Sequence, residues 1–200
     1  MKDRLQRILS GRRKVRIDDN RFQRAAVLIP LFWKGKAPYL LLTQRTEEVP
    51  LHKGQISFPG GRQDPTDRDL LATALREARE ELGVEERDVR ILGELDDTCT
   101  LSDFCISPFV GQIPYPYAFR VNPREIKELI EIPLSALLDP ANAREEMPGR
   151  SEKAPGAARS YKFGKYHIWG ATARIITQLL DLWKGKEALC PPPADSGRSS

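Results

Sequence analysis

The segment from Asp64 to Gly83 constrains the fold more than any other part of this 200-residue chain. Its apolar residues recur at three- and four-residue steps, which is the spacing of one helix face. They are Leu71, Leu75, Ala78 and Leu82. Asp64 suits an N-cap, Pro65 suits the first helical position, and Asp67 fits a capping-box acid. Since Gly83 suits a C-terminal stop, the pattern predicts an amphipathic helix that buries its apolar stripe against another element.

Short apolar runs on both sides of this helix predict β-strands. Residues 24–32 and 39–45 are separated by a turn at Gly35, so they predict a hairpin. Residues 139–160 lack an apolar period and are expected to form a mobile loop. The remaining elements are expected at 56–58, 89–92 and 104–113 (strands), after Pro133 (a short helix), at 161–169 (a strand) and at 171–183 (a helix). This set of strands and helices predicts an α/β domain in which helices cover a mostly mixed sheet.

Positive charge is concentrated at the N-terminus. Residues 1–24 contain nine Lys and Arg against three Asp, in a chain of net charge +4. A basic arm over residues 1–21 is expected to be a solvated helix and linker, with attraction of a phosphorylated substrate as the alternative. No nucleic-acid module accompanies it, so binding to nucleic acid is not expected. Residues 22–186 are expected to form the main folded domain, and residues 187–200 a disordered tail.

The sequence shows no membrane segment and no metal-binding cysteine pattern. No apolar run approaches the roughly 20 residues that span a bilayer, and no secretory h-region follows Met1. The cytoplasm is therefore the expected location. Cys99, Cys105 and Cys190 form no C-x-x-C pair, so neither a disulfide nor a structural zinc is expected. The oligomeric state is left open, and a homodimer is compatible with the sequence.

Three glutamates of the predicted helix are candidates for chemistry. At about 100° per residue, Glu77, Glu80 and Glu81 share an arc of roughly 100° away from the apolar stripe. Carboxylates this close repel one another and raise each other's pKa, and a divalent cation would keep them ionised. Oxygen ligands without His or Cys suit Mg²⁺ or Mn²⁺. The alternative is a solvated acidic face balanced by Arg76 and Arg79.

The glycine turn before the helix favours the metal site. The sequence F-P-G-G at residues 58–61, followed by R-E-A-R-E-E-L-G-V at residues 76–84, resembles the Nudix box. In that pattern a glycine and an acid precede R-E-x-x-E-E-x-G and an apolar residue. Gly61 lies 15 residues before Arg76, one more than in the general pattern, and Asp67 replaces the usual glutamate. The resemblance implies a Nudix hydrolase with an α/β/α sandwich, a mixed β-sheet flanked by helices.

The one-residue extension resembles one branch of this family, the coenzyme A diphosphatases. The signature of the branch is L-L-T-x-R, a small residue, a spaced arginine, a glycine and F-P-G-G. Here L-L-T-Q-R occupies residues 41–45 and is followed by Thr46, Gly54 and F-P-G-G, with Pro50 where the arginine is usual. The resemblance implies hydrolysis of coenzyme A or acyl-CoA to 3′,5′-ADP and (acyl-)4′-phosphopantetheine.

The resemblance also implies catalytic roles. Mg²⁺ or Mn²⁺ would be held by the Gly60 carbonyl with Glu77, Glu80 and Glu81, and would lower the pKa of a bound water. Glu77 could be a ligand or the general base. Arg76 is expected to orient a glutamate rather than to touch substrate, because bidentate pairing fixes side-chain geometry.

Substrate contacts are expected from Arg45, His52 and Gly61. Arg45 is either a phosphate contact or a plain strand-end arginine, and His52 lies either in a substrate loop or on the surface. Two alternatives to the coenzyme A reading remain. One is a Nudix hydrolase for ADP-ribose, a dinucleotide or a nucleoside triphosphate. The other is a catalytically silent module that binds a ligand or nucleic acid through the basic N-terminal arm, and such a module would not need three intact glutamates. No P-loop, G-x-G-x-x-G turn or G-x-S-x-G elbow is present.

Overall fold

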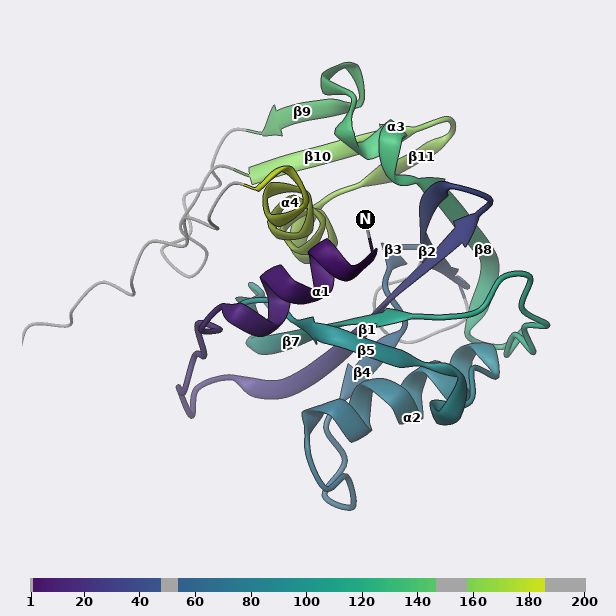
Figure 1. Cartoon of the computed structure of the whole chain (residues 1–200). Coiled ribbons are helices and arrows are strands. Elements are labelled where there is room, and N and C mark those ends of the chain that lie inside the picture. Colours follow the sequence, from purple (N-terminus) through teal and green to yellow (C-terminus); the bar gives the residue numbers. More distant parts are fainter. Residues whose placement is uncertain (1, 48–53, 147–157, 186–200) are drawn as a thin grey trace, which may run out of the picture.

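A mixed β-sheet forms the centre of the molecule. The computed structural model describes residues 2–47, 54–146 and 158–185, and eight strands in these ranges form the sheet (Figure 1). They are β1 (Gln23–Lys34), β2 (Ala37–Arg45), β3 (Ile56–Ser57), β4 (Gly60–Arg62), β5 (Arg90–Glu94), β6 (Thr98–Cys99), β7 (Phe104–Gln112) and β8 (Ile126–Pro133). The main path runs β3-β2-β1-β7-β5, while β4 pairs with β1, β6 with β7 and β8 with β2.

Both parallel and antiparallel pairs occur in this sheet. β1 and β7 are parallel, in register from Gln23 opposite Phe104 to Leu31 opposite Gln112. The other pairs are antiparallel. β1 and β2 form the predicted hairpin, in which Gly35 adopts φ 61°. The mixed sheet expected from the sequence is therefore confirmed.

Helices cover both faces of the sheet. They are α1 (Lys2–Gly11), α2 (Leu70–Leu82), α3 (Leu134–Leu138) and α4 (Gly170–Lys184), with 3₁₀ turns η1 (Glu86–Asp88) and η2 (Pro140–Asn142). α2 lies on one face, and α1 and α4 lie on the other (Figure 1). This arrangement is the α/β/α sandwich. None of the helices in the described ranges is both long and apolar enough to cross a membrane.

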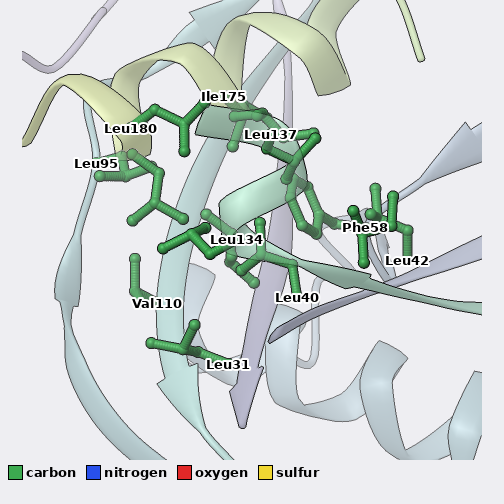
Figure 2. Packing of buried hydrophobic residues seen from close by; sticks show 14 of the residues in the cluster. Leu31, Leu40, Leu42, Phe58, Leu95, Val110, Leu134, Leu137, Ile175 and Leu180 are labelled. Atoms are coloured by element: carbon green, nitrogen blue, oxygen red, sulfur yellow. The ribbon is translucent and has the colours of Figure 1, made fainter. Parts of the chain in front are cut away.

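The alternation of side chains along β2 divides the interior into two cores. Leu40 and Leu42 point into the α4-side core, which also contains Leu179 of α4. Leu41 points into the α2-side core, where it packs with Ala78. Figure 2 shows part of the α4-side core between the sheet and α4. The predicted stripe of α2 is thus buried, apart from Leu71, which is only half-buried at its edge.

The N-terminal arm is packed, not solvated as expected. Leu5 and Leu9 of α1 are 2% and 4% exposed and belong to the α4-side core. The following segment is fixed by ion pairs, from Arg12 to Asp96 at 2.5 Å and from Lys14 to Asp97 at 2.9 Å. Arg12 and Lys14 therefore neutralise acids after β5, whereas Arg4, Arg13 and Arg16 are exposed.

A second, three-stranded sheet occupies the region expected to be a loop and one strand. Its strands are β9 (Ala143–Glu146), β10 (Ala158–Phe163) and β11 (Tyr166–Ile168), paired in the order β11-β10-β9. The expected strand over residues 161–169 is in fact a hairpin, because Gly164 at φ 56° reverses the chain. The expected loop at 139–160 contains η2, β9 and part of β10.

Helix α2 begins later than predicted. Its N-cap is Asp69, whose Oδ1 accepts the Ala72 N–H at 2.8 Å. Asp64 instead accepts the Thr66 N–H at 2.8 Å, in a turn before the helix. The predicted stop is confirmed, because Gly83 adopts the left-handed conformation at φ 68°.

Candidate active site

The glycine turn places backbone directly against β1 and α2. A Cβ at Gly60 would lie 2.3 Å from the Ala26 carbonyl oxygen and 2.7 Å from Val27 Cα. A Cβ at Gly61 would lie 2.5 Å from Glu77 Oε1. Only glycine fits both positions without displacing a neighbour, so the turn brings main-chain atoms next to a helix carboxylate.

Glu81 is buried, although the helical wheel placed it away from the core. It is 2% exposed, because the end of β2 and the segment before β8 cover this flank of α2. Arg45 Nη1 lies 3.3 Å from Glu81 Oε1. Burial raises the pKa of Glu81 to about 8, against the lowering effect of Arg45 and with smaller raising effects from Glu77 and Glu125. Glu81 Oε2 and Arg45 Nε are both buried without a hydrogen-bond partner among the described residues.

Glu77 lies at the edge of this buried region. Its carboxylate packs against Gly61, and its Oε1 lies 2.9 Å from Arg76 Nη1. Burial raises its pKa, while Arg76 opposes the shift. The Glu77 side chain is 17% exposed, so this carboxylate is partly accessible although it lies beside the buried Glu81.

Arg76 is held by Asp67 in a bidentate pair. Its Nε lies 3.0 Å from Asp67 Oδ1, and its Nη2 lies 3.1 Å from Oδ2. Its remaining Nη1 reaches Glu77 at 2.9 Å and Glu80 at 3.0 Å. The Arg76 hydrogen bond lowers the pKa of Asp67 to about 2, and Thr73 donates a further hydrogen bond at 2.9 Å. The guanidinium thus contacts two of the three candidate glutamates.

A fourth carboxylate, Glu125, lies near this group and was not found from the sequence. Its charge raises the pKa of both Glu77 and Glu81. The Asn122 side chain donates to Glu125 Oε1 at 3.0 Å, and the Asn122 N–H donates to the Glu81 carbonyl at 2.9 Å. The segment that carries Glu125 is therefore attached to the C-terminal end of α2. No motif in the sequence connects it to the helix.

The three candidate glutamates do not converge on one point. Glu80 is turned to Arg76, and its side chain is 51% exposed. Among the described residues, no group of three His, Cys, Asp or Glu side chains is arranged to hold a metal ion. Glu81 nevertheless fits a divalent cation, since its Oε2 is buried and unpartnered and its neighbour Glu77 supplies a second oxygen donor. The Gly60 backbone also lowers the pKa of Glu81, by a smaller effect than burial raises it.

The structure brings together most of the expected site residues. Arg45, Gly61, Arg76, Glu77 and Glu81 surround one region between β2, β4 and α2. His52, which was expected in a substrate loop, lies outside the described residues, as does Pro50.

Comparisons with known proteins agree with this geometry. The family described as NUDIX domain matches residues 22–148. The Nudix hydrolase NudL of Photorhabdus laumondii is 38% identical over 165 residues, covering 82% of this chain and 86% of that protein. NudL of Pectobacterium atrosepticum is 39% identical over 160 residues, covering 78% and 81%. Neither name specifies a substrate.

Two solved structures share the fold. The NUDIX domain of Shewanella oneidensis NrtR, complexed with ADP ribose, aligns with a TM-score of 0.53 at 16% identity, covering 81% of this chain and 88% of that chain. A MutT/nudix family protein from Enterococcus faecalis aligns with a TM-score of 0.55 at 13% identity, covering 85% and 65%. The family match, the sequence relatives and the glutamate-bearing helix agree, and the chain therefore belongs to the Nudix family as a pyrophosphohydrolase.

Proposed function

We propose that this enzyme hydrolyses the diphosphate of coenzyme A or acyl-CoA to 3′,5′-ADP and (acyl-)4′-phosphopantetheine, with Mg²⁺ or Mn²⁺. The observation that carries the proposal is the pair Arg45–Glu81, in which one buried donor and one buried acceptor lack partners. A buried polar atom without a partner is costly. A diphosphate with its cation supplies both missing partners, an anionic oxygen for Arg45 and a positive charge for Glu81.

Nudix hydrolases generally need divalent metal ions. We assign the ion to Glu81 and Glu77, with Glu80 and the Gly60 carbonyl completing the oxygen set. A cation held by these residues would neutralise the charge of the diphosphate and would lower the pKa of a bound water. Glu80 would join this set by rotating away from Arg76, which would open one partly exposed ion pair.

The residues of the chain then have separate tasks. Arg76 positions Glu77, because Asp67 fixes the guanidinium through two hydrogen bonds. Arg45 Nε donates to a phosphate oxygen while Nη1 remains with Glu81. Glu77 or Glu125 accepts the proton of the attacking water, since burial raises the pKa of Glu77 toward the range of a general base.

The substrate assignment is supported by the segment from Leu41 to Gly61, which resembles the coenzyme A diphosphatase signature. ADP-ribose is the second candidate, because the NrtR domain with the same fold is complexed with it. The 3′-phosphate and the pantetheine chain distinguish coenzyme A from ADP-ribose, so direct competition between the two substrates separates the proposals.

A substrate panel tests the function. The enzyme is incubated with Mg²⁺ or Mn²⁺ and with coenzyme A, acetyl-CoA, ADP-ribose, NADH or dNTPs, and the products are identified by mass spectrometry. We expect 3′,5′-ADP and 4′-phosphopantetheine from coenzyme A, and no turnover in excess EDTA. Undetectable cleavage of coenzyme A beside rapid turnover of ADP-ribose would replace the first proposal with the second. Full activity in EDTA would remove the metal mechanism.

A further inference from the structure

A separate cavity of about 420 Å³ lies between the large sheet and the β10–β11 hairpin. Gln44, Gln55 and Ile56 line one wall at the ends of β2 and β3, while Tyr166 and Trp169 line the other. The Thr172 hydroxyl at the start of α4 donates to the Ile56 carbonyl at 3.2 Å, which connects the two walls. Figure 1 shows the β10–β11 hairpin on the side of the sheet away from α2. The described lining includes none of the candidate glutamates.

The cavity is cationic. Lys127, Lys165 and His167 are among its lining residues, and no Asp or Glu is part of the described lining. The Lys165 ammonium is held 3.2 Å from Glu128, and it also lies 5.0 Å from the centre of the Tyr166 ring. Two lysines around one opening suit a phosphomonoester, which carries about −1.5 to −2 charges at pH 7 and three acceptor oxygens.

The cavity also offers a surface for a planar base. Trp169 is 52% exposed, an unusual exposure for such a large apolar side chain. An exposed indole beside cations can stack on a nucleobase, which every base allows through its π-face. The Gln44 amide donates to the Gly54 carbonyl at 3.3 Å, and an amide has further donor and acceptor capacity for a base edge. Charge and aromatic surface together favour a phosphorylated nucleoside.

The end of β2 connects this cavity to the candidate active site. Gln44 and Arg45 are successive residues at the end of β2, and the register with β8 shifts between them. Gln44 lines the cavity, whereas Arg45 contacts Glu81 at 3.3 Å. The Arg45 N–H also donates to the Gln55 carbonyl at 3.0 Å. One extended molecule that passes the end of this strand can therefore reach both faces.

We infer that this cavity binds the phosphomonoester-bearing nucleoside of the diphosphate substrate, and that Lys127 and Lys165 select substrates with this additional phosphate. The inference rests on the proposed function, because it places the scissile diphosphate at Arg45 and Glu81. It assigns specificity to a face of the sheet that carries none of the Nudix-box carboxylates.

Kinetics with two matched substrates test the selection. Coenzyme A and 3′-dephospho-coenzyme A differ only in the phosphomonoester. For the double variant Lys127→Gln/Lys165→Gln we expect KM for coenzyme A to rise about tenfold, because each lost charged hydrogen bond weakens binding. We expect kcat to be unchanged, and KM for 3′-dephospho-coenzyme A to be unchanged. Lys36→Gln, an exposed lysine in the β1–β2 turn, is the control. Equal changes for both substrates, or none, would overturn the inference.

Calorimetric binding separates this inference from the proposed reaction. 3′,5′-ADP and 5′-AMP are titrated into the enzyme in EDTA, where no turnover occurs. We expect the wild type to bind 3′,5′-ADP more tightly than 5′-AMP. In the double lysine variant the two nucleotides should bind equally. Trp169→Leu should weaken the binding of both nucleotides. If coenzyme A is not cleaved but this pattern holds, the inference stands and the proposed reaction fails. If coenzyme A is cleaved and both nucleotides bind equally, the inference fails alone.

Discussion

Arg45 Nη1 lies 3.3 Å from Glu81 Oε1, so the arginine that ends β2 faces a buried glutamate of α2. The pair balances charge but not hydrogen bonding, since Arg45 Nε and Glu81 Oε2 are buried without partners among the described residues. Native proteins satisfy nearly all buried polar atoms. We therefore propose that substrate and cation bind at this incomplete pair, next to Glu77.

Replacing Glu81 should remove activity while leaving the fold. Glu81→Gln keeps the shape of the side chain but loses the charge that binds the cation, so kcat is expected to fall by roughly 10²–10³-fold. Circular dichroism should be unchanged. Glu86→Gln, an exposed glutamate of η1, is the control and should retain wild-type kcat. A Glu81→Gln enzyme with wild-type turnover would exclude this residue from the metal site.

Stability of the metal-free enzyme should decrease as pH rises. The pKa of Glu81 is about 8 in the folded protein and near 4.5 without the fold, so between these values only the folded state holds the proton. The free energy of unfolding therefore falls from about pH 4.5 to about pH 8, because deprotonation favours the unfolded chain. Burial shifts the pKa of Glu77 in the same direction.

Urea denaturation in EDTA between pH 5 and pH 8.5 measures this slope. The difference in stability between the wild type and Glu81→Gln isolates the contribution of this carboxyl, and it should shift in favour of the variant as pH rises. Adding Mn²⁺ at pH 8 should restore wild-type stability through binding to the folded state alone. A pH-independent difference between the two proteins would show that Glu81 is ionised throughout.

The pairing of Asp67 with Arg76 should matter for turnover although Asp67 lies outside the glutamate cluster. Asp67→Asn removes the charge that fixes the guanidinium, and an outer-shell change of this kind lowers activity by about 10–100-fold. Asp64→Asn is the matched control, since the Asp64 carboxylate accepts its hydrogen bonds from Thr66 in the turn before the helix. It should change kcat/KM by less than about twofold. Equal effects of the two variants would mean that Asp67 acts only through the turn.

The N-terminal helix should contribute to stability and not to chemistry. Leu9 is 4% exposed and packs against Gly93 of β5. Leu9→Ala is expected to lower the free energy of unfolding by about 2–5 kcal/mol, as in other large-to-small core substitutions. The kcat of the folded enzyme should not change. Arg13→Ala, at an exposed position just after α1, should alter stability by less than about 0.5 kcal/mol. A neutral Leu9→Ala would indicate that α1 is only loosely attached.

The local sequence pattern was sufficient to predict the helix and the hairpin that form the candidate site. The apolar stripe, the glycine stop at Gly83 and the β1–β2 hairpin all depend on neighbouring residues, and all are present. The start of α2 was misplaced, because Asp64 and Asp69 have the same capping ability and only the fold decides which one caps. The helix boundary depended on a competition that spacing alone does not resolve.

Features that depend on distant contacts were not predictable. The burial of Glu81 results from Arg45 and from the segment before β8, which cover a flank that the wheel leaves open. Glu125 belongs to that segment, and its proximity to α2 is a property of the tertiary fold. Strand β9 was missed because its residues show no apolar alternation, and it is fixed by pairing with β10 across the chain.

Gly61 sets a limit on how this site can vary. A methyl group there would occupy space now held by the Glu77 carboxylate, with contacts of 2.5–2.8 Å to its three terminal atoms. The distance between β4 and α2 at this position therefore leaves no room for a side chain on residue 61. Any variant at residue 61 must rotate Glu77 or push the helix outward, so attempts to alter specificity by mutation should begin at the cavity lysines and leave this contact intact.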